Sequence, residues 1–525
     1  MRGSKSFLLA VALFLGLGLA ALPESEARPG GGSSYRGSSS SSRSSSSSRS
    51  SSSSRSSSSR GSSSSYGGSS SSSSSGGVLD VCLFVFFFGG MVVVAVVVVR
   101  HEFRDESRNW STAAPHGPPP PPRRQISLRS KLAGLGRVGP LGEDGKVRPL
   151  DPDFSIILFE DFASALFAKV HEARGGNRLD TFGAWLSDNA ISALQALGHP
   201  TQVKAVVVGA MTYHEVTGVA ASSPRVFVTV HFEANYTEVS DTEQSWYVAE
   251  AWTLERNTAV RSRPPDAARI SKCPNCGAPL DAVQGHLCSY CDTVVNTGGF
   301  DWVVTSMTSL TREQRGPQLT GTTEEQGTEL PTVQDPEAQE ALSALTRKDP
   351  GFSSEALHRR LEFIFHEMQT AWSKREWQGM RPFLSDNLFQ TQLYWINAYR
   401  EAGLRNITQN ARITNLSLAR VTLDEYYDAV TLRVHAVSLD YTVRDRDEEL
   451  VGGSRTRERA YSEYWTLIRG RGVRGAADTK KQCPSCGAPL AINMAGHCTH
   501  CRARVTSGEF DWVLSRIEQD EAYQG

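Results

Sequence analysis

The sequence has almost no net charge. Its 525 residues include 55 lysines and arginines against 56 aspartates and glutamates, which leaves a formal charge of −1 at neutral pH. Proteins that coat nucleic acid need a strongly basic surface. The balance of charge therefore argues against general nucleic-acid binding, and we expect no nucleic-acid partner.

Common catalytic motifs are also missing. The sequence contains no nucleophile elbow, phosphate-binding loop or dinucleotide fingerprint. His366 and Glu367 begin a pattern typical of metal-binding helices, but no second histidine follows four residues after His366. Asp428, His435 and Asp440 lie near one predicted strand, where alternation puts His435 on the face opposite to both aspartates. We therefore predict that the protein is not an enzyme.

Cysteine is scarce, yet eight of the nine cysteines form two quartets with identical spacing. Each quartet reads CxxC, then eleven residues, then CxxC, which is typical of a zinc ribbon. Four thiolates fill a tetrahedral metal site and leave no open position, so a structural role is expected. We predict two structural zinc ions, although four sulfurs also suit iron. The predicted ligands are Cys273, Cys276, Cys288, Cys291, Cys483, Cys486, Cys498 and Cys501. Because each quartet is already full, the neighbouring His286, His497 and His500 are expected to be loop residues.

The two quartets close two copies of a longer unit. Three motifs recur in the same order: LSDN at 186–189 and 384–387, WTL at 252–254 and 465–467, and FDW at 300–302 and 510–512. The second copy has about fifteen more residues between its second helix and its last strand, and we expect them in loops. The aromatic residues of the FDW motifs are expected to pack back on the sheet, because they directly follow each metal-binding hairpin.

Within each copy, helical patterns come before strand patterns. Asp151 and Asp349 each precede a proline and are predicted to cap the first helix of their copy. Ser187 and Ser385 are predicted to cap the second helix. Strand patterns then follow at 203–208, 225–234, 246–256, 411–418, 429–439 and 461–468. This order predicts an α+β fold, with helices packed on one face of a curved antiparallel sheet.

The N-terminal part of the chain has no globular pattern. Residues 1–27 have a basic start, an apolar run and small residues at the end, which predicts a signal peptide. Residues 28–77 are rich in serine, arginine and glycine, and this composition predicts a disordered tract. Residues 78–99 contain an unbroken run of apolar residues and glycine, which matches a transmembrane helix of roughly 20 residues. The ninth cysteine, Cys82, lies in this run and is predicted to be an ordinary apolar helix residue.

The stretch after the predicted span indicates its orientation. Between residues 100 and 140, eight basic residues outnumber three acidic ones, as expected on the cytoplasmic side of a membrane. Whether the signal is cleaved or stays as an anchor, the globular part then lies in the cytoplasm, where reducing conditions favour metal binding over disulfides. Four basic residues either follow this bias alone or contact anionic lipid headgroups: Arg123, Arg124, Arg129 and Lys131.

The second copy carries residues of a known family. Trp377, RPFLS at 381–385, GLRNI at 403–407 and EYW at 463–465 resemble the C-terminal domain of subunit 44 of the mitochondrial inner-membrane import translocase, the Tim44-like domain family. Its bacterial relatives, in which a zinc ribbon follows the domain, look closer still. The first copy resembles the family less, because GAW at 183–185 replaces the Arg-Pro-Phe stretch.

The predicted domain order follows from these motifs. A basic, proline-rich linker at 100–150 leads to a first α+β domain at 151–260, a first zinc ribbon at 270–310, a linker at 311–348, a second α+β domain at 349–470 and a second zinc ribbon at 480–521. Each copy is long enough to build one modest hydrophobic core.

The resemblance implies a cone-shaped fold similar to nuclear transport factor two, with a pocket between sheet and helices. It also implies docking at a membrane and a role in protein transport. We therefore expect a single-pass protein of the bacterial inner membrane that binds membrane lipid and a translocation or assembly protein, without turnover. Two alternatives stay open: a cone pocket that binds a small apolar ligand or catalyses a reaction, and nucleic-acid binding through the ribbons.

Overall fold

The structure, a computed structural model, describes residues 123–124, 126–137, 148–265, 272–279, 283–317, 319 and 327–525. The predicted signal peptide at 1–27, the serine-rich tract at 28–77, the predicted span at 78–99 and Cys82 lie outside these residues. Among the residues described, no helix is long and apolar enough to cross a membrane. The structure therefore leaves the three N-terminal predictions as predictions.

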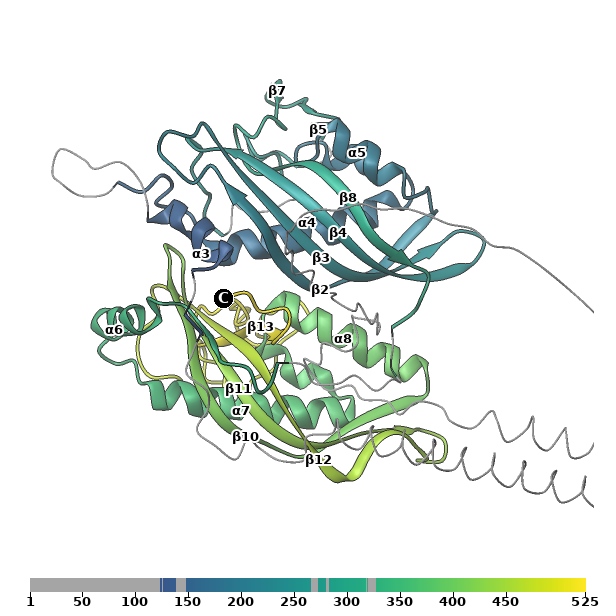
Figure 1. The fold of residues 1–525 in the computed structure, drawn as a ribbon, viewed down its shortest axis with the longest axis vertical. Helices are drawn as coiled ribbons and strands as arrows, with labels where there is room; N and C mark the ends of the chain where they lie inside the picture. The colour runs from purple at the N-terminus through teal and green to yellow at the C-terminus, as the bar shows by residue number, and fades with distance from the viewer. Residues whose placement is uncertain are drawn as a thin grey trace, which may run out of the picture. The chain divides into compact units, whose positions relative to one another are not determined.

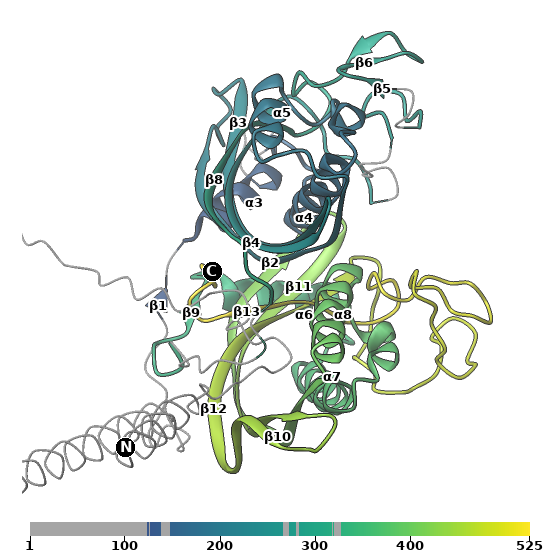
Figure 2. The same cartoon turned by 90° about the vertical axis from the view of Figure 1, so that its right-hand side faces the viewer.

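The first copy places two helices before a four-stranded antiparallel sheet (Figure 1). The strands are hydrogen-bonded in the order β2-β3-β4-β8, and the sheet curves around α4 (Figure 2). The elements are α4 (Ile156–Arg174), α5 (Asp188–Gln195), β2 (Gln202–Thr217), β3 (Arg225–Val239), β4 (Glu243–Asn257) and β8 (Val303–Glu313).

The second copy repeats this arrangement, with strand order β10-β11-β12-β13. Its elements are α7 (Ser354–Lys374), α8 (Asp386–Glu401), β10 (Leu404–Leu423), β11 (Tyr427–Arg444), β12 (Leu450–Gly470) and β13 (Val513–Gln519). All six predicted strands lie inside observed strands, which are longer. Helices and antiparallel sheets in both copies confirm the α+β class.

Short elements precede the first copy, join the helices within each copy, form the first ribbon and lead into the second copy. They are β1 (Arg123–Arg124), α3 (Leu128–Ala133), the 3₁₀ turns η2 (Gly134–Gly136), η3 (Leu179–Phe182) and η5 (Trp377–Phe383), the ribbon strands β5 (Val283–Gln284), β6 (Leu287–Cys288) and β7 (Thr293–Val294), β9 (Val333–Gln334), and α6 (Ala338–Lys348). Strand β1, from the predicted linker at 100–150, pairs in parallel with β9, from the predicted linker at 311–348.

The predicted caps of the second helices are confirmed, and those of the first helices are wrong. The hydroxyls of Ser187 and Ser385 accept hydrogen bonds from backbone N–H groups in the first turns of α5 and α8. Helix α4 is capped by Ser155 and α7 by Ser353, so Asp151 and Asp349 cap neither. The Asp-Pro pattern misled because each helix begins four residues later than predicted, after a serine whose hydroxyl accepts the N–H of Leu158 or Ala356.

The two aspartates instead belong to a buried cluster that occurs once in each copy. Asp151 is fully buried and accepts a hydrogen bond from Arg256 at 2.8 Å, and the guanidinium carbon of Arg256 lies 4.8 Å from the ring centre of Trp302. In the second copy Asp349 pairs with Arg469 at 3.0 Å, and Arg469 lies 4.6 Å from the Trp512 ring. The tryptophan of each FDW motif is therefore packed against the domain, as expected, whereas the phenylalanines Phe300 and Phe510 are only partly buried.

The extra residues of the second copy do not lie in loops, so that prediction is wrong. Helix α8 has 16 residues where α5 has 8, and β12 has 21 where β4 has 15. Residues in a longer helix can bury apolar side chains and satisfy their own backbone hydrogen bonds. Phe389, Trp395 and Tyr399 of α8 are all buried in this way.

The two copies meet through a buried carboxylate, Glu160 of α4, which is 2% exposed. It accepts hydrogen bonds from Arg129 of α3 at 2.6 and 3.1 Å and from the Tyr213 hydroxyl of β2 at 2.9 Å. Arg516 of β13, in the second copy, lies 3.0 Å from its other oxygen. Burial alone would raise the pKa of Glu160, but the two arginines outweigh it and lower the pKa to about 2. All described residues belong to one compact unit, and Glu160 is one of its internal ion-pair centres.

Candidate functional site

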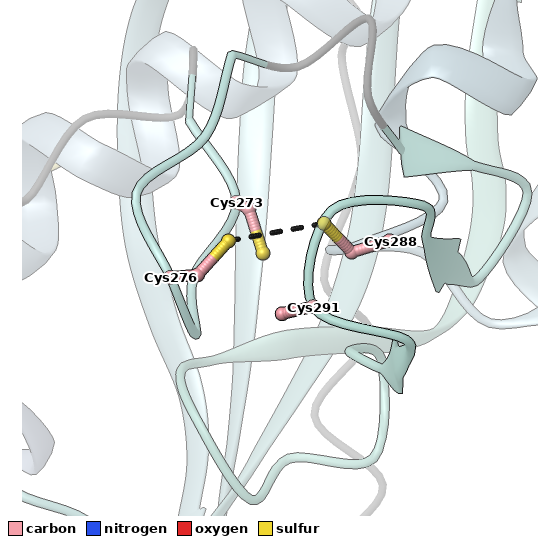
Figure 3. A group of neighbouring side chains, drawn as sticks. All are labelled: Cys273, Cys276, Cys288 and Cys291. Atoms are coloured by element: carbon pink, nitrogen blue, oxygen red, sulfur yellow. Dashed lines mark hydrogen bonds between the residues drawn. The ribbon is translucent and has the colours of Figure 1, made fainter.

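The first cysteine quartet is assembled by two turns that face each other (Figure 3). Cys273 and Cys276 lie on one turn, in which Gly277 has a φ of +76° and donates its N–H to the Cys273 carbonyl at 3.0 Å. Cys288 ends β6, and its carbonyl accepts the N–H of Asp292 at 2.8 Å, which turns the chain at Cys291. The four sulfurs of the quartet all lie within 4.8 Å of one another. Glycine favours this left-handed turn because it has no Cβ.

The second quartet has the same construction. Gly487 has a φ of +73° and donates to the Cys483 carbonyl at 2.8 Å, and the sulfurs of Cys483, Cys486, Cys498 and Cys501 also lie within 4.8 Å of one another. Tetrahedral zinc with Zn–S bonds of about 2.3 Å needs sulfurs about 3.8 Å apart. The sulfurs of Cys276 and Cys288 are 3.9 Å apart, and those of Cys483 and Cys501 are 3.8 Å apart. Both quartets therefore fit a metal ion of this size with four thiolate ligands.

Neighbouring donors lower the thiol pKa of one cysteine in each quartet, Cys291 and Cys501. A backbone N–H would also lower the thiol pKa of Cys276 and Cys486, but desolvation and hydrogen bonds with the other cysteines outweigh it and raise the pKa. The amide nitrogen of Asn275 lies 3.4 Å from the sulfur of Cys291. The backbone N–H of Ala503 is the largest influence on Cys501 and helps lower the pKa of its thiol to about 6. A bound metal would join two turns that few other contacts hold together, which is a structural role.

Each ribbon is held to its domain by an aspartate at the first position of a helix. In the first copy the ring of His286, in the ribbon, makes two contacts with the domain. Its Nδ1 lies 3.0 Å from the Gly183 carbonyl and its Nε2 lies 2.7 Å from Asp188 Oδ1. Both partners are acceptors, so this geometry suits a ring that carries two protons. Burial would lower the pKa of His286, but the hydrogen bonds to Asp188 and the Gly183 carbonyl, with the charge of Asp188, together outweigh it and raise the pKa. The predicted loop histidine is thus a docking residue.

The second copy adds a cation from the domain to this contact. Position 381, equivalent to Gly183, is an arginine that donates to Asp386 and, at 3.0 Å, to the carbonyl of Met494 in the ribbon. Gly496 stands where the first ribbon has His286, and a Cβ there would meet the hydroxyl of Thr506. In the first copy the ribbon's His286 meets the aspartate, whereas in the second Arg381 of the domain and Arg504 of the ribbon both meet it. The aspartate is kept in both copies.

We predict that Gly183→Ala loosens the first ribbon. A Cβ at this position would overlap the backbone carbonyl of Gly285, which cannot move without shifting the ribbon turn. Gly379→Ala is the matched control, because a Cβ there meets nothing within 4 Å. Amide hydrogen exchange of residues 283–295 should rise in the first variant and stay unchanged in the second. Equal exchange in both variants would show that the close approach at Gly183 does not hold the ribbon.

Asp428, His435 and Asp440, the residues considered for catalysis, do not lie together, and both aspartates have hydrogen-bond partners of their own. Asp428 is buried and accepts a hydrogen bond from Lys348 at 2.6 Å. Asp440, near the other end of β11, accepts one from Asn406 at 2.8 Å. The two lie twelve residues apart on one strand, a separation on the order of 40 Å. Burial and the charge of Arg433 lower the pKa of His435 to about 4. These three residues do not form a joint site.

A buried polar group that the sequence reasoning missed lies inside the first copy. Glu250 is fully buried, accepts a hydrogen bond from the indole N–H of Trp252 at 2.8 Å and lies 3.2 Å from His171. In the second copy Glu463 and Trp465 make the same contact at 2.9 Å. The recurrence of Glu-x-Trp in both copies was the signal that could have identified it. Because both copies keep the pair, it is best explained as support for the core.

The lipid-contact candidates have different environments. The side chain of Arg129 is 12% exposed and is engaged by Glu160, so it has little surface left for a headgroup. Lys131, two residues later, is exposed. Arg123 and Arg124 form β1, and their side chains lie outside the described part of the structure. Lys131 is therefore the candidate whose described side chain is free to reach lipid.

Comparison with known families identifies one part of the chain. Residues 338–478 match the Tim44-like domain family. The match begins at α6 and ends before the second ribbon, so it covers the second copy and not the first. The prediction of this domain is confirmed for one copy, while the first copy shares the order of helices and strands without the family match. No curated protein matches the chain.

Proposed function

We propose that this protein is a non-enzymatic tethering protein anchored in the bacterial inner membrane, with a role in protein transport or assembly. The observation that carries the proposal is the Tim44-like domain at residues 338–478. In this proposal the first copy is a diverged domain of the same kind. Its sheet order, its Glu250–Trp252 pair and its Asp151–Arg256 pair, all with counterparts in the second copy, support that view.

The proposed architecture follows the predicted segments. Residues 78–99 would span the membrane, and the two domains at 151–260 and 349–470 would lie on the cytoplasmic side with their ribbons at 270–310 and 480–521. Two zinc ions would hold the ribbons rigid through the eight cysteines. Lys131, together with Arg123 and Arg124, would contact anionic lipid headgroups, while a membrane or translocation protein binds the domains.

The pairing of buried charges supports binding over turnover. Asp151, Asp349 and Asp428 each have a cationic partner within 3.0 Å. Arginine or lysine already engages each of these carboxylates in an ion pair, which is a structural role. The inner charges therefore suit stable domains that present fixed surfaces.

The proposal predicts that the full chain behaves as an integral membrane protein. After alkaline carbonate extraction of cell membranes it should stay in the pellet, and a variant lacking residues 81–99 should move to the supernatant. A reporter protein that works only in the cytoplasm should be active when it is fused after Gly525. Release of the full chain by carbonate would contradict the anchor, and a reporter active only in the periplasm would reverse the orientation. Crosslinking in intact cells would then identify the bound protein.

A further inference from the structure

The first ribbon exposes an apolar patch. Leu287 is 46% exposed, Tyr290 79% and Val294 50%, and all three lie within eight residues of one hairpin. Leu287 and Val294 are directly paired across β6 and β7, and Tyr290 lies on the turn between Cys288 and Cys291. Large apolar side chains are seldom exposed together on a rigid turn unless something covers them. We call Leu287, Tyr290 and Val294 the ribbon patch.

The ribbon fold does not itself require these apolar residues. The second ribbon has the same cysteine spacing and the same turns, yet its equivalent positions are His497, His500 and Arg504. Arg504 pairs with Asp386 at 2.8 Å, so that corner serves docking within the chain. Because one ribbon is stable with polar residues at these three positions, the apolar choice in the other points to a contact outside the ribbon.

Charge selects among the possible occupants of the ribbon patch. Residues 272–295 contain one lysine against two aspartates, whereas residues 482–505 contain two arginines and no acidic residue. A divalent metal with four thiolates would add two negative charges to each ribbon. Asp292 lies between Tyr290 and Val294 in the sequence, whereas Asp188 is paired with His286. A second copy of this ribbon and an anionic bilayer would both be repelled.

We infer that the ribbon patch binds a protein segment that combines apolar anchors with basic residues. Apolar side chains of the partner would cover Tyr290, Leu287 and Val294, and its lysines or arginines would face the negative ribbon. This inference rests on the proposed tethering function and deepens it, because it gives the partner a chemical class. Both ribbons dock on their own domains, but they use these three positions differently: the second ribbon uses Arg504 for docking, and the first presents an apolar surface.

The test uses the full chain in nanodiscs and an 18-residue probe peptide of leucine and lysine with amphipathic helical spacing. The wild type should bind this peptide, and a peptide with glutamate in place of lysine should bind about tenfold more weakly or worse. The triple variant Leu287→His, Tyr290→His, Val294→Arg should lose about tenfold or more in affinity. Both quartets should still hold metal in this variant, since the second ribbon carries these same residues.

Met494→Lys is the matched control, because Met494 is 45% exposed on the second ribbon and its loss should leave binding unchanged. A photoreactive residue at position 290 identifies the occupant directly. Crosslinks to the leucine–lysine peptide support the inference, whereas crosslinks to lipid or to a second copy of the chain overturn it. Equal binding by the wild type and the triple variant also overturns it. Carbonate extraction of the chain tests the anchor separately, so the two proposals can fail independently.

Discussion

Replacing Glu160 by alanine is expected to lower the free energy of unfolding by about 3–5 kcal/mol, because it leaves buried arginine charge without its partner. Arg129 is 12% exposed and Arg516 24% exposed, and Glu160 is the carboxylate that lies between them. The Tyr213 hydroxyl would lose its acceptor as well. The measurement is urea unfolding of the detergent-solubilised full chain, followed by tryptophan fluorescence.

The matched control is Glu172→Ala in the same helix. Glu172 pairs with Lys169 at 2.7 Å, but the two side chains are 40% and 55% exposed, so the change should cost no more than about 1 kcal/mol. Hydrogen exchange should rise in β13 for the Glu160 variant only, since Arg516 is the residue of the second copy that Glu160 contacts. Equal destabilisation by the two substitutions would show that the buried centre does not join the copies.

The contribution of Glu160 to the free energy of unfolding should also depend on pH in a defined direction. The pKa is about 2 in the folded protein against 4.5 for the free side chain, so the folded state favours the ionised form. The stabilisation is therefore complete above pH 4.5 and is lost as the pH falls toward 2. The difference in stability between the wild type and Glu160→Ala should shrink across this range. A difference that stays constant down to pH 2 would contradict the ion-pair explanation.

Cys288→Ser and Cys498→Ser are each expected to remove one of two bound metal ions. Both cysteines are buried at equivalent positions of the two quartets, with 0% and 1% exposure. Structural zinc contributes on the order of 10 kcal/mol to the folding of small metal-binding modules. Loss of one ligand should therefore unfold that ribbon and make it sensitive to protease, while the domains stay folded. Elemental analysis of the purified full chain gives the metal count.

Cys82→Ser serves as the control, because Cys82 belongs to the predicted span and to neither quartet. It should retain two metal ions per chain. The same analysis separates zinc from iron, since both ions would fit four sulfurs but only one will be present in quantity. A folded wild type without metal under reducing conditions would contradict the ribbon interpretation for both quartets.

The sequence predicted the local features well where a few neighbouring residues decide them. Ser187 and Ser385 cap helices because a serine hydroxyl needs only an N–H three residues later. The cysteine spacing placed four sulfurs together because two tight turns bring each pair into range. The prediction that Asp151 caps a helix was wrong for the opposite reason. Its partner, Arg256, lies 105 residues away, and no local pattern announces a contact across that distance.

The same difference between local patterns and long-range contacts applies to the candidate site. Arg129 looked like a lipid-contact residue because it stands in a basic stretch, yet the fold places it against Glu160, 31 residues later. His286 looked like a loop residue because the quartet beside it is complete, yet it reaches Asp188, 98 residues before it. The sequence also does not show which side chains are exposed. Tyr290 and Trp302 are both aromatic, yet Tyr290 is 79% exposed and Trp302 is 3% exposed.

The amino-acid sequence by itself determined the two metal-binding quartets, the repeat, the α+β class and the Tim44-like character of the second copy, because these depend on spacing and composition along the chain. Only the tertiary structure decided which charges are paired and which surfaces stay open. Ion pairs such as Glu160–Arg516 join residues that are far apart in the sequence, and exposure depends on everything that packs around a side chain. The spacing of the eight cysteines thus identifies two metal-site modules, and only the fold shows that the first of them leaves Leu287, Tyr290 and Val294 exposed.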